Sequence, residues 1–254
     1  MLRDIVLIHG GGQGGWVWAE TIAAIRVEAG EDAGRVLTLD VPGCGVKRED
    51  DTSDMSVPEV IEMLAAELDA NDVRDALLVG HSQGGTLLPG LVAARSDRIA
   101  RAVYFTCAAP NQGQTVAQMM GRGVQGTAEN EIGWPLDPET VSPSELLNAA
   151  FCNDMDEEMS RTFLAKLGKD NWPVACGHDW NSWHYDAACH VPATYVIALA
   201  DKILPVAWQE RFAARVNASR LVRIDSGHQG MNTRPFSLAE ILIAEARLGD
   251  LTAS

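Results

Sequence analysis

The sequence predicts an α/β fold, in which a mostly parallel central sheet is flanked by helices and carries an inserted helical cap. Four short apolar runs alternate with helical patterns near the start of the chain, at residues 5–8, 36–39, 76–79 and 102–105. Each run is continuously apolar rather than alternating, so both faces of each strand are expected to be buried, as in a parallel sheet covered by helices. The separation of strands by helices indicates the same class.

The other predicted elements continue this alternation: helices at 16–27, 56–68 and 84–94, a strand at 193–198, a helix at 206–216, a strand at 220–224 and a last helix from Ser237. Two of these helices begin with serine three residues before glutamate, Ser56 with Glu59 and Ser237 with Glu240. This spacing is typical of a capping box, so both serines are expected to cap their helices.

Residues 111–190 break the alternation. They hold glycines, prolines, short helical patterns at 144–151 and 156–167, and four of the seven tryptophans. The strands that follow are too few to form a sheet by themselves. We therefore interpret residues 1–110 and 191–254 as one core, with residues 111–190 inserted between its halves as a cap.

Composition narrows the classes of partner. A formal net charge of −15 argues against nucleic acid, because phosphate binding needs a basic surface, and it disfavours anionic membranes. No segment has the apolar length of a membrane span or a signal peptide. Five scattered cysteines without CxxC spacing suggest reduced thiols. We expect a cytoplasmic protein that acts on a small molecule, and the sequence leaves a homodimer open.

A nucleophile is predicted at Ser82. Gly80-His81-Ser82-Gln83-Gly84 matches G-x-S-x-G directly after a predicted strand and directly before a predicted helix. Such a strand-to-helix turn holds the nucleophile in a strained conformation above the sheet and tolerates only small flanking residues. The pentapeptide alone would be weak, and its place between strand and helix makes it informative.

His228 and Asp201 are the predicted base and its orienting acid. A serine hydroxyl needs a base at neutral pH, and His228 follows the last predicted strand, at the sheet edge where sites form in α/β proteins. Asp201 follows the preceding strand and satisfies the chain order nucleophile, acid, histidine. The rival position for the acid, after the fourth strand, holds Thr106 and Cys107 instead. Of the other histidines, His9 is expected to be structural.

An oxyanion hole is predicted at the backbone N–H groups of Gln83 and Gly11. Gln83 follows the nucleophile, and Gly11 lies in the glycine-rich loop after the first strand. The same loop fits G-x-G-x-x-G, but the acidic residue that a dinucleotide site needs further on is not evident, and no Gly-Lys phosphate loop is present. No cofactor is expected.

These segments, together with the turn that begins at Asp40, resemble the α/β-hydrolase superfamily over residues 3–110 and 190–247. The likeness is greatest to the small esterases grouped with plant methylesterases, hydroxynitrile lyases and bacterial pyrethroid-type carboxylesterases. It implies an α/β-hydrolase fold and a cofactor-free serine hydrolase that works through an acyl-enzyme.

Two departures bear on the reaction that the resemblance implies. Hydroxynitrile lyases of this group carry lysine directly after the histidine and threonine where Gly11 stands, whereas this chain has Gln229 and Gly11. Hydrolysis of a carboxylic ester or lactone, as in carboxylesterases, is therefore favoured over lyase chemistry. Acyl transfer, a biosynthetic lyase or cyclisation step, or ligand binding on a hydrolase scaffold stay as alternatives.

The cap is expected to shape the substrate pocket. Trp134, Trp180 and Trp183 are the candidates for an apolar lining over Ser82, which would favour a small apolar or aromatic substrate. Tryptophans that only build the core of the cap are the equally weighted alternative. The histidines and cysteines between residues 176 and 190 fit no known zinc spacing, so no metal is expected.

Overall fold

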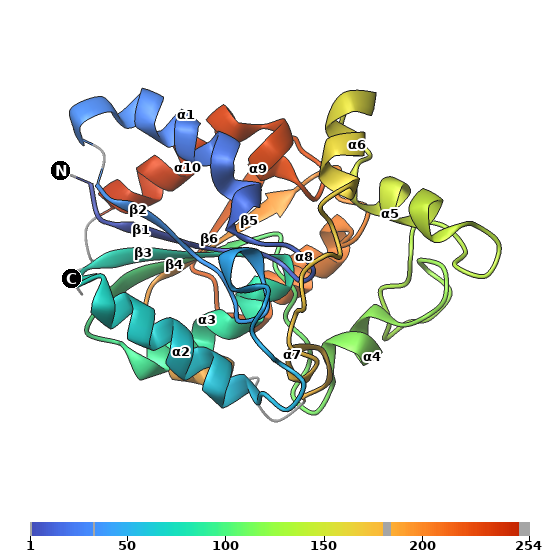
Figure 1. The fold of residues 1–254 in the computed structure, drawn as a ribbon, viewed down its shortest axis with the longest axis horizontal. Helices are drawn as coiled ribbons and strands as arrows, with labels where there is room; N and C mark the ends of the chain where they lie inside the picture. Colours follow the sequence, from blue (N-terminus) through green and yellow to red (C-terminus); the bar gives the residue numbers. More distant parts are fainter. Residues whose placement is uncertain (1, 33, 180–183, 249–254) are drawn as a thin grey trace.

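The computed structural model describes residues 2–32, 34–179 and 184–248, and its centre is a six-stranded sheet in which every neighbouring pair is parallel. The strand order is β2-β1-β3-β4-β5-β6 (Figure 1). The strands are β1 (Ile5–Ile8), β2 (Val36–Leu39), β3 (Ala76–His81), β4 (Ile99–Phe105), β5 (Ala193–Ala198) and β6 (Arg220–Ile224).

Helices cover both faces of the sheet. In Figure 1, α1 and α10 lie together above it, whereas α2 and α3 lie below it. Helix α8 packs into the same hydrophobic cluster as α2 and α3. The α-helices are α1 (Ala19–Ala29), α2 (Val57–Ala70), α3 (Leu88–Ala94), α4 (Val116–Met120), α5 (Pro143–Phe151), α6 (Glu157–Leu164), α7 (Ala175–His178), α8 (Val206–Arg215), α9 (Gly230–Thr233) and α10 (Pro235–Arg247).

Alternate side chains of β1, β3, β4 and β5 enter two separate hydrophobic clusters. In β1, Val6 and Ile8 pack into the cluster that holds α2, α3 and α8, while Ile5 and Leu7 pack into the cluster that holds α1 and α10. Successive side chains of a strand point to opposite faces, so a strand covered on both sides is apolar over most of its length. This confirms the fold class predicted from the continuous apolar runs.

The segment 111–190 contributes helices α4 to α7 and, in its described part, no strand of the sheet. Its helices α4, α5 and α6 lie at the right of Figure 1, beyond the ends of the strands. Backbone N–H groups of this segment bind core loops at that edge: Gly168 donates to Gly12 O at 2.9 Å and Asn171 to Gly43 O at 2.6 Å. The segment is therefore anchored on the loops that follow the first two strands.

One of the two predicted capping boxes is confirmed. The Ser56 side chain accepts from Glu59 N, and the Glu59 side chain accepts from Ser56 N. The prediction at Ser237 is wrong, because α10 begins two residues earlier at Pro235 and its first turn has no side-chain cap. Proline at the first helical position already has the helical φ, and the N–H that it lacks would have no partner within the helix in any case, which explains the earlier start.

A buried carboxylate ties α10 to the sheet. The Glu245 side chain is 1% exposed and accepts from Arg101 Nη2 at 2.9 Å, Thr194 Oγ1 at 2.8 Å and Arg220 Nε at 3.1 Å. Arg101 is likewise buried, whereas the Arg220 side chain is 52% exposed. The cluster thus joins α10 to three neighbouring strands.

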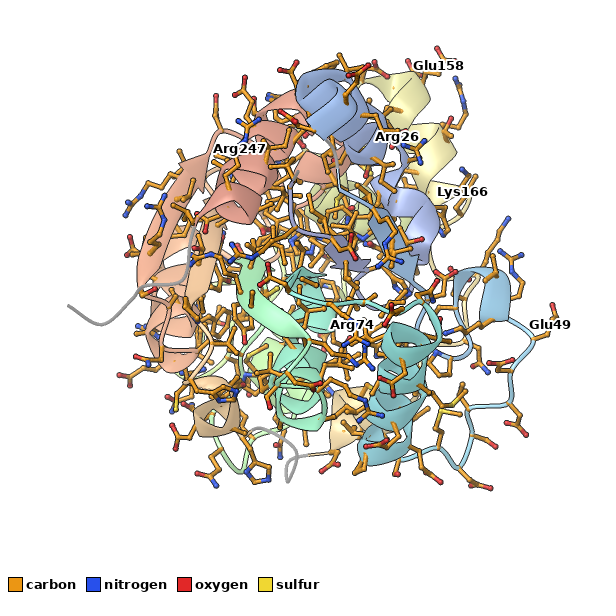
Figure 2. All side chains as sticks on the ribbon, turned by 90° about the vertical axis from the view of Figure 1, so that its left-hand side faces the viewer. Arg26, Glu49, Arg74, Glu158, Lys166 and Arg247 are labelled. Carbon is orange, nitrogen blue, oxygen red and sulfur yellow. The ribbon has the colours of Figure 1, made fainter. Side chains whose placement is uncertain are left out.

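Unlike Glu245 and Arg101, most charged side chains of the described residues lie at the surface. The residues labelled in Figure 2 are all exposed: Arg26, Glu49, Arg74, Glu158, Lys166 and Arg247. Among the helices of the described residues, none has the length and apolar character needed to cross a membrane.

Replacing Glu245 by alanine is predicted to lower the free energy of unfolding by about 3–5 kcal/mol, because it leaves the charge of Arg101 buried and unpaired. Arg220→Ala is the matched control and should cost less than about 1 kcal/mol, since its side chain is half exposed. Urea unfolding of both variants measures the difference. A smaller loss in Glu245→Ala than in Arg220→Ala would contradict this assignment.

Candidate active site

Ser82 stands at a tight turn directly after β3. Its backbone φ is +52°, a left-handed conformation that residues with a side chain rarely adopt. Backbone atoms lie close to both flanking glycines: a Cβ on Gly84 would lie 2.2 Å from His9 O, and a Cβ on Gly80 would lie 3.0 Å from Gly85 Cα. The predicted strand continues to the turn, but the chain then forms a 3₁₀ helix over Ser82–Leu87 before α3 starts at Leu88.

His228 and Asp201 meet at the same edge of the sheet. Asp201 follows β5, His228 follows β6, and the His228 Nδ1 atom lies 2.7 Å from Asp201 Oδ2 with both side chains fully buried. The carboxylate oxygen accepts, so Nδ1 carries the proton and Nε2 of the neutral ring is an acceptor. That Nε2 is buried and has no hydrogen-bond partner among the described residues.

The Asp201 carboxylate receives four hydrogen bonds. Its Oδ1 accepts from the N–H groups of Ile203 at 2.7 Å and Leu204 at 2.9 Å. Its Oδ2 accepts from the Thr106 hydroxyl as well as from His228. A buried carboxylate surrounded by donors on both oxygens is held in one orientation as an acceptor. Thr106 had no role in the sequence prediction, which examined that position only for an acidic residue.

His81, the residue before Ser82, connects the turn to the histidine loop. Its Nε2 donates to His228 O at 3.0 Å, and the two rings are 4.7 Å apart. Burial, followed by the proximity of His228, lowers the pKa of His81 well below its usual 6.5. His81 is therefore a neutral link between the segments that carry Ser82 and His228.

The glycine-rich loop after β1 lies against Ser82. A Cβ on Gly10 would lie 2.9 Å from Ser82 Cβ, and a Cβ on Gly11 would lie 2.5 Å from Gln83 Oε1. The Gln83 side chain also reaches segment 111–190, the predicted cap, where its Nε2 donates to Cys176 O at 2.9 Å in α7. The structure thus brings Gly11, Gln83 and the cap together beside Ser82.

His9 lies outside this group. Its Nδ1 donates to Gly10 O at 2.8 Å, and its Nε2 accepts from Val41 N at 3.1 Å. Burial lowers its pKa, an effect that the Gly10 carbonyl and Asp40 only partly oppose. Both ring nitrogens are occupied by backbone groups, so His9 holds two loops together.

The cap places phenylalanine at the histidine. Phe151 of α5 meets the His228 ring edge to face at 5.5 Å, and Phe163 of α6 packs on Phe151 at 6.2 Å. Of the predicted pocket residues, Trp134 packs against the hydrophobic cluster that holds α2, α3 and α8. Its indole N–H donates to Gly121 O at 3.3 Å. Trp180 and Trp183 lie outside the described residues.

The reactive groups at this edge are a hydroxyl, an imidazole and a carboxylate. Within the ranges that the structure describes, no group of three His, Cys, Asp or Glu side chains is placed to hold a metal ion. An imidazole oriented through Nδ1 with an unpartnered Nε2 is suited to take a proton from a hydroxyl that comes within hydrogen-bond reach.

The two buried histidines predict that acid destabilises the protein. Since the pKa values of His9 and His81 are lowered in the folded state, the unfolded chain binds more protons as the pH falls below about 6.5. Each group should cost up to about 1.4 kcal/mol per pH unit in that range, with full stability above it.

Urea unfolding between pH 7.5 and 5.5 measures this slope. His81→Gln should reduce the dependence of the unfolding free energy on pH by the contribution of one proton. His190→Gln, at an exposed position, should keep the wild-type slope. Equal slopes in the wild type and His81→Gln would refute the assignment.

Comparison with known proteins agrees with this architecture. A carbendazim hydrolyzing esterase from Nocardioides sp. is 28% identical over 123 residues, which are 48% of this chain and 49% of that protein. Putative methylesterase 11, chloroplastic, from Arabidopsis thaliana is 30% identical over 97% of this chain and 64% of that protein. The chain therefore spans about half to two thirds of the length of these relatives.

A solved extracellular alpha/beta-hydrolase from a Paenibacillus species superposes with a TM-score of 0.76 at 20% identity, covering 97% of this chain and all of that one. At that identity the likeness shows the fold. The sequence profile of the alpha/beta hydrolase family matches residues 5–241. This confirms the resemblance seen in the sequence: the chain belongs to the alpha/beta hydrolase family.

Proposed function

We propose that this protein is a serine hydrolase that cleaves a carboxylic ester, or a lactone, through an acyl-enzyme. The observation that carries the proposal is the His228 ring: its Nδ1 is bound by Asp201, while its buried Nε2 has no partner in the described part of the chain. A general base needs a ring nitrogen that is free to accept a proton, and the bond from His81 Nε2 to His228 O, 3.0 Å long, joins this ring's loop to the turn that carries Ser82. Ser82, at this strained turn, is the proposed donor of that proton.

In the proposed reaction, Ser82 Oγ attacks the ester carbonyl while His228 Nε2 takes the hydroxyl proton. Asp201 holds the ring in the required tautomer and stabilises the imidazolium. The N–H groups of Gly11 and Gln83 bind the oxyanion of the tetrahedral intermediate. His228 then protonates the leaving alcohol, and a water molecule repeats the sequence on the acyl-enzyme to release the acid.

Relatives support ester hydrolysis over other uses of these residues. The similar proteins are named as a methylesterase and as an esterase of carbendazim. A third, polyneuridine aldehyde esterase from Rauvolfia serpentina, is 23% identical over 95% of this chain and 94% of that protein. Their names share the ester bond and differ in the rest of the substrate.

A small apolar or aromatic substrate is supported by the cap residues near His228. Phe151 contacts the His228 ring, and Phe163 extends the aromatic surface behind it. An aromatic group on the substrate would gain edge-to-face contacts there. Trp134, Trp180 and Trp183 stay predictions as further pocket residues.

Ser82→Ala is predicted to lower turnover of a simple aryl ester by about 10⁴-fold or more, because the variant has no nucleophile. Ser237→Ala, at an exposed position on α10, is the matched control and should keep wild-type turnover. Steady-state hydrolysis of p-nitrophenyl esters measures both. Near-wild-type turnover by folded Ser82→Ala would eliminate this mechanism.

Phe151→Ala is predicted to raise KM for a phenyl or naphthyl ester about threefold to tenfold, because one aromatic contact is lost, and to change KM for a methyl acetate ester less. Phe236→Ala, at an exposed site on α10, serves as the control. A wild-type enzyme that prefers acetates to aromatic esters, or equal effects of Phe151→Ala on both, would argue against an apolar pocket.

A further inference from the structure

Thr106 is a strained residue at the centre of the site. It is the first residue after β4, it is fully buried, and its φ is +40°. A β-branched residue in the left-handed region is an outlier, since glycine and asparagine fit there far better. Strain of this kind is concentrated at functional sites.

The backbone around Thr106 is fixed on both sides. Thr106 N donates to Val196 O in β5 at 2.9 Å, and Ala108 N donates to Ser82 O at 3.1 Å. The turn after β4 is thus hydrogen-bonded to the strand that leads to Asp201 and to the turn that carries Ser82. These contacts maintain the unusual backbone, and they leave open why the side chain is threonine.

The hydroxyl supplies the reason for a threonine. It donates to Asp201 Oδ2, the same oxygen that accepts from His228 Nδ1. The opposite oxygen, Oδ1, is already held by the backbone N–H groups of Ile203 and Leu204. Without the Thr106 hydroxyl, Oδ2 would have His228 as its one protein donor among the described residues.

We propose that Thr106 is a positioning residue of the Ser82 site, whose hydroxyl aligns Asp201 Oδ2 with His228 and limits how tightly Asp201 holds the charged form of the ring. Two donors on one oxygen share its negative charge, so each is bound less strongly than it would be alone. Loss of the Thr106 hydroxyl is therefore expected to strengthen the attraction between Asp201 and the charged form of the ring. The kinetic part of this inference rests on the proposed function.

Other titratable groups lie beside this pair, and one of them is Asp154, whose Oδ2 accepts from the N–H of Gly227, next to His228, at 2.7 Å. The His81 ring lies 4.7 Å from His228, and Tyr195 interacts electrostatically with Asp201. Burial lowers the pKa of His81 and raises the pKa of Tyr195. Both groups are thus neutral near pH 7, and neither changes charge in the range where removal of the Thr106 hydroxyl would act.

The test compares Thr106→Val, which removes the hydroxyl but keeps the branched shape, with Thr106→Ser, which keeps the hydroxyl. In ¹⁵N-histidine-labelled protein, with the His228 signals identified by their loss in His228→Ala, Thr106→Val should raise the midpoint of the ring titration by roughly half to one pH unit. At a pH below the wild-type midpoint, kcat/KM for an aryl ester should then fall by the corresponding factor, about threefold to tenfold, with KM unchanged. Thr106→Ser should match the wild type in both measurements.

An unchanged midpoint in folded Thr106→Val would overturn the proposal, and so would an equal shift in Thr106→Ser. Thr106→Ala gives a second hydroxyl-free variant, expected to shift in the same way, should the valine variant not fold. The titration needs no ester turnover. If Ser82→Ala kept its activity while Thr106→Val moved the midpoint, the proposed function would fail and the role of Thr106 would stand.

Discussion

The buried hydrogen bond between His228 Nδ1 and Asp201 Oδ2 is the interaction on which the site depends. A carboxylate without access to water is tolerated only when donors surround it. Here the donors come from three places: the turn after β4, the loop after β5 and the loop after β6. The parallel sheet supplies this arrangement because all its strands end at one edge. The orientation of the imidazole therefore depends on the fold, because the parallel sheet brings the donors to Asp201 together.

The sequence predicted the parts that follow from strand order and local chain geometry. Continuous apolar strands gave the sheet, and the chain order of Ser82, Asp201 and His228 identified residues that the structure places at its edge. The contact of Thr106 with Asp201 could not be predicted, because it depends on a positive φ that threonine rarely adopts. The prediction that Ser237 caps the last helix was wrong for a local reason, because the helix already begins at the proline two residues earlier.

The cap was the least predictable region, since it is held by loop contacts rather than by periodic elements. Its backbone binds Gly12 and Gly43, and its α7 carbonyl at Cys176 binds the Gln83 side chain. Such bonds need exact loop conformations that no hydrophobic pattern encodes. They matter for function because they place the cap directly beside Gln83, a predicted oxyanion donor. Substrate choice is therefore expected to depend on the cap, and bond cleavage on the sheet edge.

The central claim is that Ser82 is a nucleophile activated by His228. The most direct test is covalent labelling of the purified protein with a fluorophosphonate, followed by intact-mass and peptide mass spectrometry. The account predicts one adduct per chain, located on Ser82, and its loss in His228→Ala. Absence of labelling in the wild type, or an adduct on another residue, would contradict it.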